Sequence, residues 1–343
     1  MLKEILLQKS SKVYDSKLFK SFGKVLLQDS TTLSLPAVLK NSFVGSTSQN
    51  GTSAVAKIQS IIDIKRMNFV QFILGSYTEN DQKASKSILA NCQKGDIVIR
   101  DLGYFSIPVF EEIMQAGVHF LSRLKFAVKI FDENGVEILL KELFKGNKAI
   151  DMWVYIGIKN KLRVRLVMVP LPKEQAAEKI RKAKLNKDKR SNHNEDYYKW
   201  QGYTIYITSV DSSIWTTKEV CNAYKVRWQI EIIFKSWKTG LNLQSSIHSG
   251  FTNEERVRVY IFLMLVFVCL FTKNIYCVYK DRLENKMGLQ ISIVKLSLYL
   301  SVNLFKLFEM TNTKIELEIM KHCCYEKRKD RQNITQLYKN ENP

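Results

Sequence analysis

The sequence predicts an α/β fold, and three features of the chain indicate it. Short apolar runs that end in polar turn clusters alternate with helical patterns over the first 125 residues. Residues 126–170 carry β-rich alternation, and the pattern from Thr217 to about Leu307 is mostly helical. Hydrophobic residues make up 45% of the chain, with only 5 prolines and 14 glycines, so a disordered or collagen-like chain is excluded.

The first part of the chain reads as strands with two helices between them. A run at Val25–Asp29 predicts a strand that ends in a turn at Asp29-Ser30-Thr31-Thr32. Further strands are expected at 54–64 and 69–74, which form a hairpin, and at 95–101 and 118–124. Helices are expected at 84–90 and 106–115. This order of elements is typical of an α/β core.

The later segments differ in character. Residues 162–169 alternate so that Arg163 and Arg165 share one face, which predicts an antiparallel strand with a basic face. Residues 173–190 hold eight basic and three acidic side chains, and either a solvated loop or frayed helix or a DNA-contacting segment would explain them. A strand follows at 203–208. We therefore divide the chain into segments 1–125, 126–200, 201–250 and 251–343.

The net charge is the first indication of function. The chain has 53 Lys and Arg against 33 Asp and Glu, a formal charge of +20. Such a charge favours a nucleic-acid partner over a membrane surface. The apolar run Val259–Phe271 has thirteen residues, too few to span a bilayer, and predicts a buried core helix. Without a signal peptide or a Cys-x2-Cys pair, the chain is expected to be cytoplasmic, with free thiols and no membrane partner.

Residues 224–238 predict one amphipathic helix. At about 100° per residue, Tyr224, Arg227, Glu231 and Lys238 share a stripe about 60° wide. An apolar ridge suited to packing on a sheet lies opposite and comprises Val226, Ile230, Ile233 and Trp237. On the helix alone, Arg227 and Glu231 are as well explained by a surface ion pair.

Two aspartates change the interpretation of that helix. Asp29 and Asp101 each follow an apolar strand, where side chains project from the carboxyl edge of a sheet. Taken singly, each is as typical of a turn. Together with Glu231 they supply three carboxylates, the ligands that Mg²⁺ or Mn²⁺ needs in a two-metal phosphoryl-transfer site.

The spacing of these residues resembles a known signature. Tyr224, Arg227, Glu231 and Lys238 match Y-x2-R-x3-E-x6-K, which resembles the signature of bacterial insertion-sequence DDE transposases of the insertion-sequence-four family. Residues 28–31 and 100–104 look like the two aspartate motifs of that family, and Trp237-Lys238-Thr239-Gly240 is similar to its continuation past the glutamate. The motifs spread over residues 28–240.

The resemblance implies a fold, a reaction and a set of partners. It implies an RNase H-like catalytic core interrupted by a β-rich insertion, followed by a helical C-terminal region. Asp29, Asp101 and Glu231 would hold two divalent ions, Mg²⁺ or Mn²⁺, for cleavage and strand transfer at element ends. Tyr224, Arg227 and Lys238 would bind phosphates of the DNA. The resemblance also implies that the protein acts as a homodimer on bacterial, nucleoid-associated DNA.

Two departures from the family pattern leave alternatives open. The family's stacking tryptophan corresponds by spacing to Thr204, and nearby Tyr203, Tyr206 and Trp200 are better explained by core packing. Only 28 residues precede Asp29, so we expect the N-terminal DNA-recognition domain to be missing. A truncated, inactive DNA-binding remnant that regulates an intact transposase is therefore the alternative function, and a structure-selective nuclease is a further one.

Overall fold

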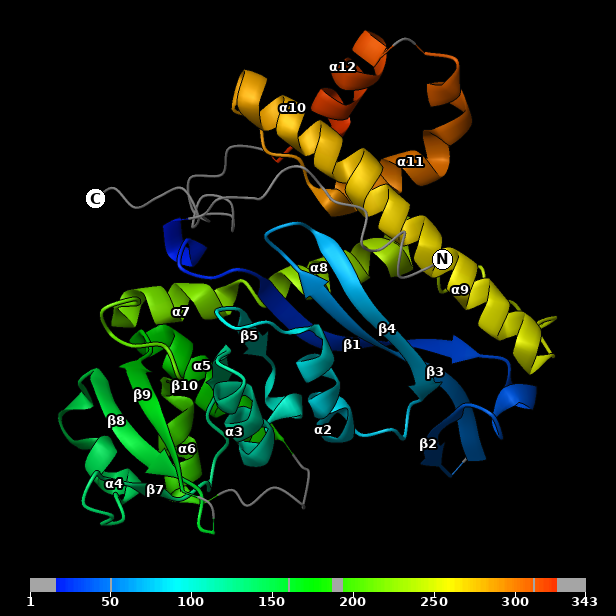
Figure 1. Ribbon diagram of the computed structural model, residues 1–343. Coiled ribbons are helices and arrows are strands. Elements are labelled where there is room, and N and C mark those ends of the chain that lie inside the picture. Colours follow the sequence, from blue (N-terminus) through cyan, green and yellow to red (C-terminus); the bar gives the residue numbers. More distant parts are fainter. Residues whose placement is uncertain (1–16, 50, 160, 187–193, 311, 326–343) are drawn as a thin grey trace. The chain divides into compact units, whose positions relative to one another are not determined.

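The computed structural model describes residues 17–325, apart from 50, 160, 187–193 and 311 (Figure 1). The chain forms two compact units. The first comprises residues 24–84 and 226–325 with the short stretch 17–20, and the second comprises residues 85–225 with 21–23. Each unit contributes strands and buried apolar side chains.

The sheet of the first unit is built around one long strand. β3 (Gly51–Asp63) pairs antiparallel with β1 (Val25–Leu35), β2 (Val44–Ser48) and β4 (Asn68–Ser76). The 3₁₀ turns η1 (Lys17–Phe19) and η2 (Ala37–Leu39) precede and follow β1. The expected hairpin of 54–64 and 69–74 is therefore confirmed as β3 and β4.

The turn expected at 29–32 is wrong, because β1 runs through it without a break. Pairing with β3 continues from Leu26 to Leu35. Thr31, Leu33 and Leu35 alternate on the buried side of the strand. Burial of this alternating face outweighs the local turn preference of the Asp-Ser-Thr-Thr cluster. Asp29 consequently lies in the middle of a strand and not at its end.

Helices of the first unit cover this sheet and extend beyond it (Figure 1). They are α2 (Asp81–Ala84), α8 (Trp228–Lys235), the π-helix η6 (Ser236–Gly240), α9 (Glu254–Leu270), the π-helix η7 (Phe271–Tyr276), α10 (Cys277–Met287), α11 (Ile293–Phe308) and α12 (Asn312–Cys323). The predicted ridge of Val226, Ile230, Ile233 and Trp237 is buried throughout. The Trp237 ring packs against Phe69 and Phe72 of β4 at 5.1 and 6.0 Å.

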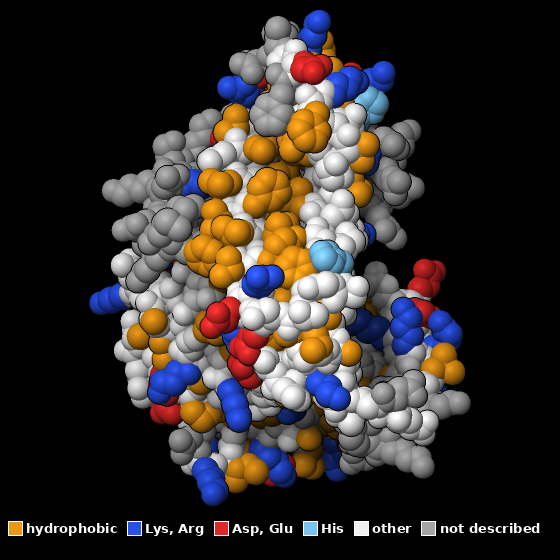
Figure 2. All heavy atoms as spheres, turned by 90° about the vertical axis from the view of Figure 1, so that its right-hand side faces the viewer, with side chains coloured by type: hydrophobic (Ala, Val, Ile, Leu, Met, Phe, Trp, Pro, Cys, Tyr) orange, Lys and Arg blue, Asp and Glu red, His pale blue; other side chains and the backbone are white. Residues whose placement is uncertain are grey.

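The apolar run at 259–271 is not the fully buried core helix that we expected. α9, η7 and α10 form one helical run, and residues 254–284 have a mean hydropathy of 2.2 in their most apolar stretch, of which 39% is buried. By length and composition this run could cross a membrane, a test that core helices of soluble proteins also pass. Val259, Leu263, Phe267 and Leu270 are 58, 57, 42 and 39% exposed. Figure 2 shows apolar side chains gathered in a column on this side of the molecule.

The second unit has a mixed sheet. Its strands are β5 (Ile97–Arg100), β6 (His119–Arg123), β7 (Ile130–Phe131), β8 (Ile150–Ile156), β9 (Leu162–Pro170) and β10 (Tyr203–Thr208). β5 and β6 are parallel, and β6, β10, β9, β8 and β7 then follow as antiparallel neighbours. The helical segments are η3 (Ser85–Asn91), η4 (Leu102–Tyr104), α3 (Ile107–Gln115), α4 (Leu140–Leu143), η5 (Lys145–Asn147), α5 (Lys173–Leu185), α6 (Glu195–Gln201) and α7 (Thr217–Lys225).

The basic face predicted for residues 162–169 is only half correct. Arg163 is exposed, whereas Arg165 is buried and forms an ion pair with Asp151. Arg165 donates to the two carboxylate oxygens of Asp151 at 2.7 and 2.6 Å, and its Nη1 donates to the carbonyls of Val210 and Trp215. The loop before α7 thus covers one arginine of the pair and leaves the other in solvent.

The basic segment after β9 forms a solvated helix. α5 has no buried side chain, and Glu178 pairs with both Arg181 and Lys182. Residues 187–190 of the segment lie outside the described part of the chain. Both interpretations expect a solvent-exposed basic segment here, so contact with DNA stays a prediction.

Replacement of Arg165 by alanine tests the buried pair. Arg165→Ala removes the guanidinium that donates to the Asp151 carboxylate and to two buried carbonyls, so we expect the free energy of unfolding to fall by about 3 kcal/mol. Arg163→Ala on the same face is the matched control, with an expected loss under about 1 kcal/mol because that arginine is 48% exposed. Urea unfolding measures both, and equal losses would contradict the assignment.

Candidate active site

β1 places the first predicted carboxylate on a rigid part of the backbone. Asp29 is the fifth of eleven residues in β1 and faces Ser60 across the β1–β3 ladder. One of its oxygens, Oδ1, accepts a hydrogen bond of 2.8 Å from the backbone N–H of Ser30. The side chain is 17% exposed. It therefore has limited access to solvent and a defined orientation.

Arg227 joins that carboxylate to the predicted glutamate. Its Nη1 lies 3.4 Å from Oδ2 of Asp29 and 2.7 Å from Oε1 of Glu231. The arginine side chain is 8% exposed and the Glu231 side chain 37%. One nearly buried positive charge is thus shared by two carboxylates from a strand and a helix that lie almost 200 residues apart in sequence.

The predicted continuous helix at 224–238 is wrong, because it breaks at Val226–Arg227. α7 ends at Lys225 and α8 begins at Trp228. The Gln229 N–H donates to the Val226 carbonyl, and the Ile230 N–H donates to the Arg227 carbonyl. These two hydrogen bonds close the intervening turn. Four residues of the predicted stripe are therefore divided between two helices, a turn and η6.

Tyr224 lies on α7, in the second unit, and not on the helix of Glu231. It is 5% exposed, and its ring packs against Tyr206 with 4.8 Å between centroids. Burial raises the pKa of the Tyr206 hydroxyl above the ordinary tyrosine value. Tyr224 is placed among aromatic groups of its own unit.

Lys238 lies in η6, one residue after the buried Trp237. Burial lowers the pKa of its ammonium group from the ordinary lysine value. π-helical turns inside helices are frequent at functional sites. Lys238 is thus a half-buried cation on the same helical segment as Glu231.

Asp101 follows the buried strand β5 in the second unit, as predicted. Its carbonyl accepts a hydrogen bond from the N–H of Tyr104, which closes the short turn η4. The preceding Arg100 is fully buried and donates to the carbonyl of Ser85. Burial lowers the pKa of Arg100 to about 10, so it remains a cation at neutral pH.

The aromatic residues expected near Thr204 serve the core of the second unit. Tyr203 stacks on Phe144, Trp200 contacts Phe126, and Tyr206 contacts Tyr224. The core-packing interpretation of these three side chains is therefore confirmed.

Sequence reasoning missed Trp228, which stands beside Arg227. The guanidinium carbon of Arg227 lies 5.2 Å from the centre of the Trp228 ring, and this tryptophan is 52% exposed. A large aromatic residue next to a predicted site arginine was the available signal. About half of the Trp228 surface is therefore in solvent next to the shared ion pair.

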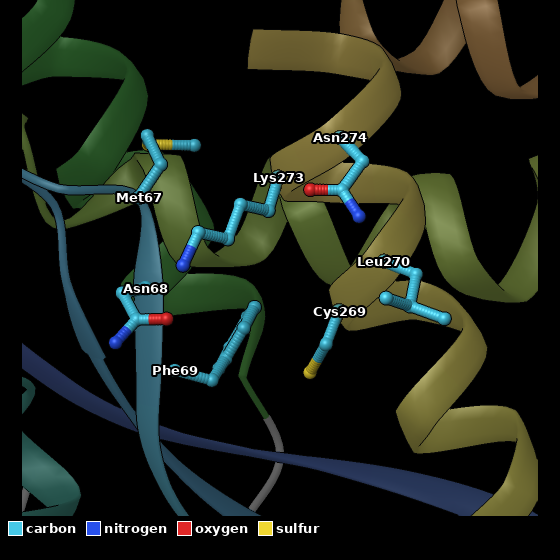
Figure 3. Close-up of a pocket in the computed structure, with 7 residues that line it drawn as sticks. All are labelled: Met67, Asn68, Phe69, Cys269, Leu270, Lys273 and Asn274. Atoms are coloured by element: carbon cyan, nitrogen blue, oxygen red, sulfur yellow. The ribbon is translucent and has the colours of Figure 1, made fainter. Parts of the chain in front are cut away.

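A hollow in the first unit lies away from these groups. It is lined by residues that include Met67, Phe69, Cys269, Lys273 and Asn274, between β4 and the helical run of α9 and η7 (Figure 3). Its volume of about 10 Å³ has room for a single water molecule. Lys273 extends into it, and burial lowers the pKa of its amine. This hollow is too small to hold a small-molecule substrate.

The carboxylates of the first unit have the chemistry of a divalent-cation site. Asp29 and Glu231 supply hard oxygen ligands and already converge on one positive charge. Within the described residues, no group of three His, Cys, Asp or Glu side chains stands close enough to form a finished metal site. His322, Cys323 and Cys324 accordingly form no such cluster. The Asp29–Glu231 pair fits a cation, provided that the Arg227 guanidinium moves away.

Comparison with known proteins identifies relatives of this chain. Residues 20–267 match the family described as the transposase DDE domain. The chain is 27% identical over 277 residues to the transposase for insertion sequence element IS231F of Bacillus thuringiensis subsp. israelensis, covering 74% of this chain and 57% of that protein. It is 28% identical over 239 residues to the transposase for insertion sequence element IS1151 of Clostridium perfringens, covering 64% and 50%.

Two further comparisons extend the coverage. The transposase for IS231D of Bacillus thuringiensis subsp. finitimus is 26% identical over 322 residues, covering 88% of this chain and 66% of that protein. The chain thus spans between half and two thirds of these relatives. Among solved structures, the piggyBac transposase synaptic complex with hairpin DNA aligns over 91% of this chain and 60% of that chain, with a TM-score of 0.44 and 11% identity.

Replacement of Arg227 tests whether the two carboxylates form a cation site. In Arg227→Gln the shared charge is lost, so we expect the free energy of unfolding to fall by about 2 kcal/mol without metal. Because Mn²⁺ can then relieve the repulsion of the two carboxylates, it should raise the melting temperature of this variant more than that of the unsubstituted chain.

Arg258→Gln is the matched control for that measurement. Arg258 also pairs with a glutamate four residues away, Glu254 at 2.8 Å, but on an exposed helix surface. Its melting should respond to Mn²⁺ as the unsubstituted chain does. Equal Mn²⁺ shifts in the two variants would contradict a cation site at Asp29 and Glu231.

Proposed function

Because this chain belongs to the transposase DDE-domain family, we propose that it is a metal-dependent DNA transposase that cleaves element ends and transfers the freed strands. The observation that carries the proposal is the convergence of Asp29 and Glu231 on the single guanidinium of Arg227. A strand carboxylate and a helix carboxylate aimed at one cation are two parts of the three-carboxylate arrangement expected from the family resemblance.

The proposed catalytic residues are Asp29, Asp101 and Glu231. In this proposal they hold two Mg²⁺ or Mn²⁺ ions, which when bound clamp the attacking and leaving oxygens of an in-line displacement. The surrounding strands β1 and β5 would then belong to an RNase H-like core, with residues 126–200 as a β-rich insertion before the glutamate. The mid-strand position of Asp29 supports this role, since a rigid backbone preserves ligand geometry.

The proposed DNA-binding residues are Tyr224, Arg227 and Lys238. Arg227 would exchange its carboxylate partners for a phosphate, because a guanidinium binds both with the same fork of donors. Lys238 would add a point charge, and Tyr224 a hydroxyl. The exposed ring of Trp228 offers a stacking surface for an unpaired base.

The net charge of +20 supports a DNA partner. Three carboxylates in a catalytic centre repel a phosphate polymer, so the surrounding chain has to attract it. A steep loss of binding with added salt would follow from phosphate contacts of this kind. Cytoplasmic, nucleoid-associated DNA is the location that this proposal implies.

Carboxylate substitutions test the reaction. Asp29→Asn, Asp101→Asn and Glu231→Gln each remove a metal ligand at nearly constant volume, so each should lower Mg²⁺-dependent cleavage and strand transfer at least about 100-fold. The assay uses duplexes that carry the ends of the element surrounding the coding region. Asp211→Asn and Glu255→Gln are the matched controls, since both carboxylates are exposed and lie outside the proposed site.

The same assay separates the alternative functions. Binding of end DNA without any cleavage by the unsubstituted chain would favour an inactive remnant that regulates an intact transposase. Cleavage without strand transfer would favour a nuclease. Activity that survives any of the three catalytic substitutions would contradict the proposed site.

We also propose that two copies pair through the exposed face of α9. Val259, Leu263, Phe267 and Leu270 recur at intervals of four, four and three residues, which places them along one side of the helix over about 17 Å. When a second copy packs against this stripe about a two-fold axis, the stripe of each copy is covered by the same stripe of the other. Two element ends require two catalytic centres, so a homodimer serves the proposed reaction.

A charge placed in the stripe tests that contact. Leu263→Glu should convert the dimer to a monomer in sedimentation velocity, because burying an unpaired carboxylate opposes association. Leu317→Glu, at an equally exposed leucine on α12, is the control and should leave the dimer intact. An unsubstituted chain that stays monomeric with end DNA, or binds lipid vesicles through this face, would contradict the proposal.

A further inference from the structure

Ser60 lies directly across the sheet from Asp29. The two residues are partners in the antiparallel ladder of β1 and β3, and Phe72 of β4 is the partner of Ser60 on its other side. Directly opposed residues of an antiparallel pair project from the same face, with about 4.5–5.5 Å between their Cβ atoms. Asp29, Ser60 and Phe72 therefore form one row across the first unit's sheet.

The neighbours of that row show which face it occupies. Trp237 packs against Phe72, and Arg227 bonds to Asp29, so the segment of α8 and η6 covers this face. On the opposite face, Ser30 and Gln59 both donate to Oδ1 of Asp81 at the start of α2. Ser60 thus belongs to the same layer as the proposed catalytic carboxylates.

The hydroxyl of Ser60 is buried and unused in this arrangement. The residue is 1% exposed, and its Oγ has no hydrogen-bond partner among the described residues. The buried hydroxyls of Ser236, Thr272 and Ser297, by comparison, each donate to a carbonyl of their own helical segment. A buried polar group without a partner weakens the fold, so its presence calls for an explanation. Alanine would fill the same space without that cost.

Within this row, the acceptor that lies next to the Ser60 hydroxyl is the Asp29 carboxylate. Its Oδ1 accepts the Ser30 N–H, while its Oδ2 faces the Arg227 guanidinium. A carboxylate that exchanges a guanidinium for a divalent cation keeps its orientation only if other donors hold it, and such outer donors tune metal affinity. A serine one strand away has the reach and the chemistry for this.

We propose that Ser60 is a positioning residue of the catalytic centre, whose hydroxyl donates to the Asp29 carboxylate when a divalent cation replaces Arg227 there. The inference rests on the proposed function, since it assigns a residue to the same site. Ser60 itself contacts neither DNA nor metal. Its role is to keep the strand carboxylate aligned while the arginine leaves.

The test compares Ser60→Ala, Ser60→Thr and Ser297→Ala with the unsubstituted full chain. Mn²⁺ affinity is measured from the rise of the melting temperature with Mn²⁺ concentration, without DNA, and from the Mn²⁺ concentration that gives half-maximal cleavage of end DNA. Ser60→Ala should weaken both about 10- to 100-fold. Ser60→Thr keeps the hydroxyl and fits a strand, so it should stay within about 3-fold of the unsubstituted chain.

Ser297→Ala removes a buried hydroxyl outside the site and should change neither quantity. Without metal, Ser60→Ala should melt no lower than the unsubstituted chain, because the lost hydroxyl has no bond there. This readout separates positioning from packing.

Different outcomes overturn different parts of the assignment. Unchanged Mn²⁺ affinity in Ser60→Ala, or equal losses in the alanine and threonine variants, would overturn the role of Ser60 and leave the proposed function intact. A melting temperature that Mn²⁺ moves equally in the unsubstituted chain and in Asp29→Asn would remove the metal site itself, and with it both proposals.

Discussion

The arrangement of the first unit depends on one shared positive charge. Arg227 is nearly buried, and its Nη1 serves the carboxylates of Asp29 and Glu231 together. Two carboxylates in one partly buried place repel each other unless a cation stands between them. The guanidinium therefore allows the fold to hold both acidic groups before any ligand arrives. Under the proposed function, the structural ion pair and the ligand site would be the same set of atoms.

Two features of the fold hold that charge in place. β1 stays paired through Asp29, so the aspartate has a fixed starting point on the sheet. Behind Glu231, buried Ile230, Ile233 and Trp237 anchor the helical segment onto the same sheet. Apolar burial thus supplies the stability, and the polar groups supply the specific arrangement. Arg227 keeps helical backbone dihedrals at the break before Trp228, so its side chain still reaches Glu231 four residues later.

Much of the fold could be predicted from local patterns. Alternation predicted the hairpin of β3 and β4, and helical periodicity predicted the buried ridge that ends in Trp237. The patterns failed where long-range pairing or cover decides the outcome. Turn-forming residues at 29–32 joined a strand because β3 lies alongside them, and Arg165 was buried by a loop some fifty residues later.

The candidate site shows the same division. Residue types and spacing selected Asp29, Arg227 and Glu231, which the fold brings together. Periodicity could not reveal the break after Lys225, because Val226 continues the apolar ridge across it. Nor could it single out Ser60, since a serine in an apolar strand carries no signal until strand register shows what it faces. The partial exposure of α9 could not be predicted either, because composition does not show which side of an apolar helix other elements cover.

The uninterrupted pairing of β1 has a consequence for the motions of the site. The amide hydrogens around Asp29 lie in a ladder with β3, itself flanked by β2 and β4 on its other edge. Such amides exchange with solvent only when the sheet opens cooperatively. Isotope exchange should therefore be slow at the amides around Asp29. Under the proposed function, Asp29 would stay in place on its strand while Arg227 and Glu231 rearrange for a ligand.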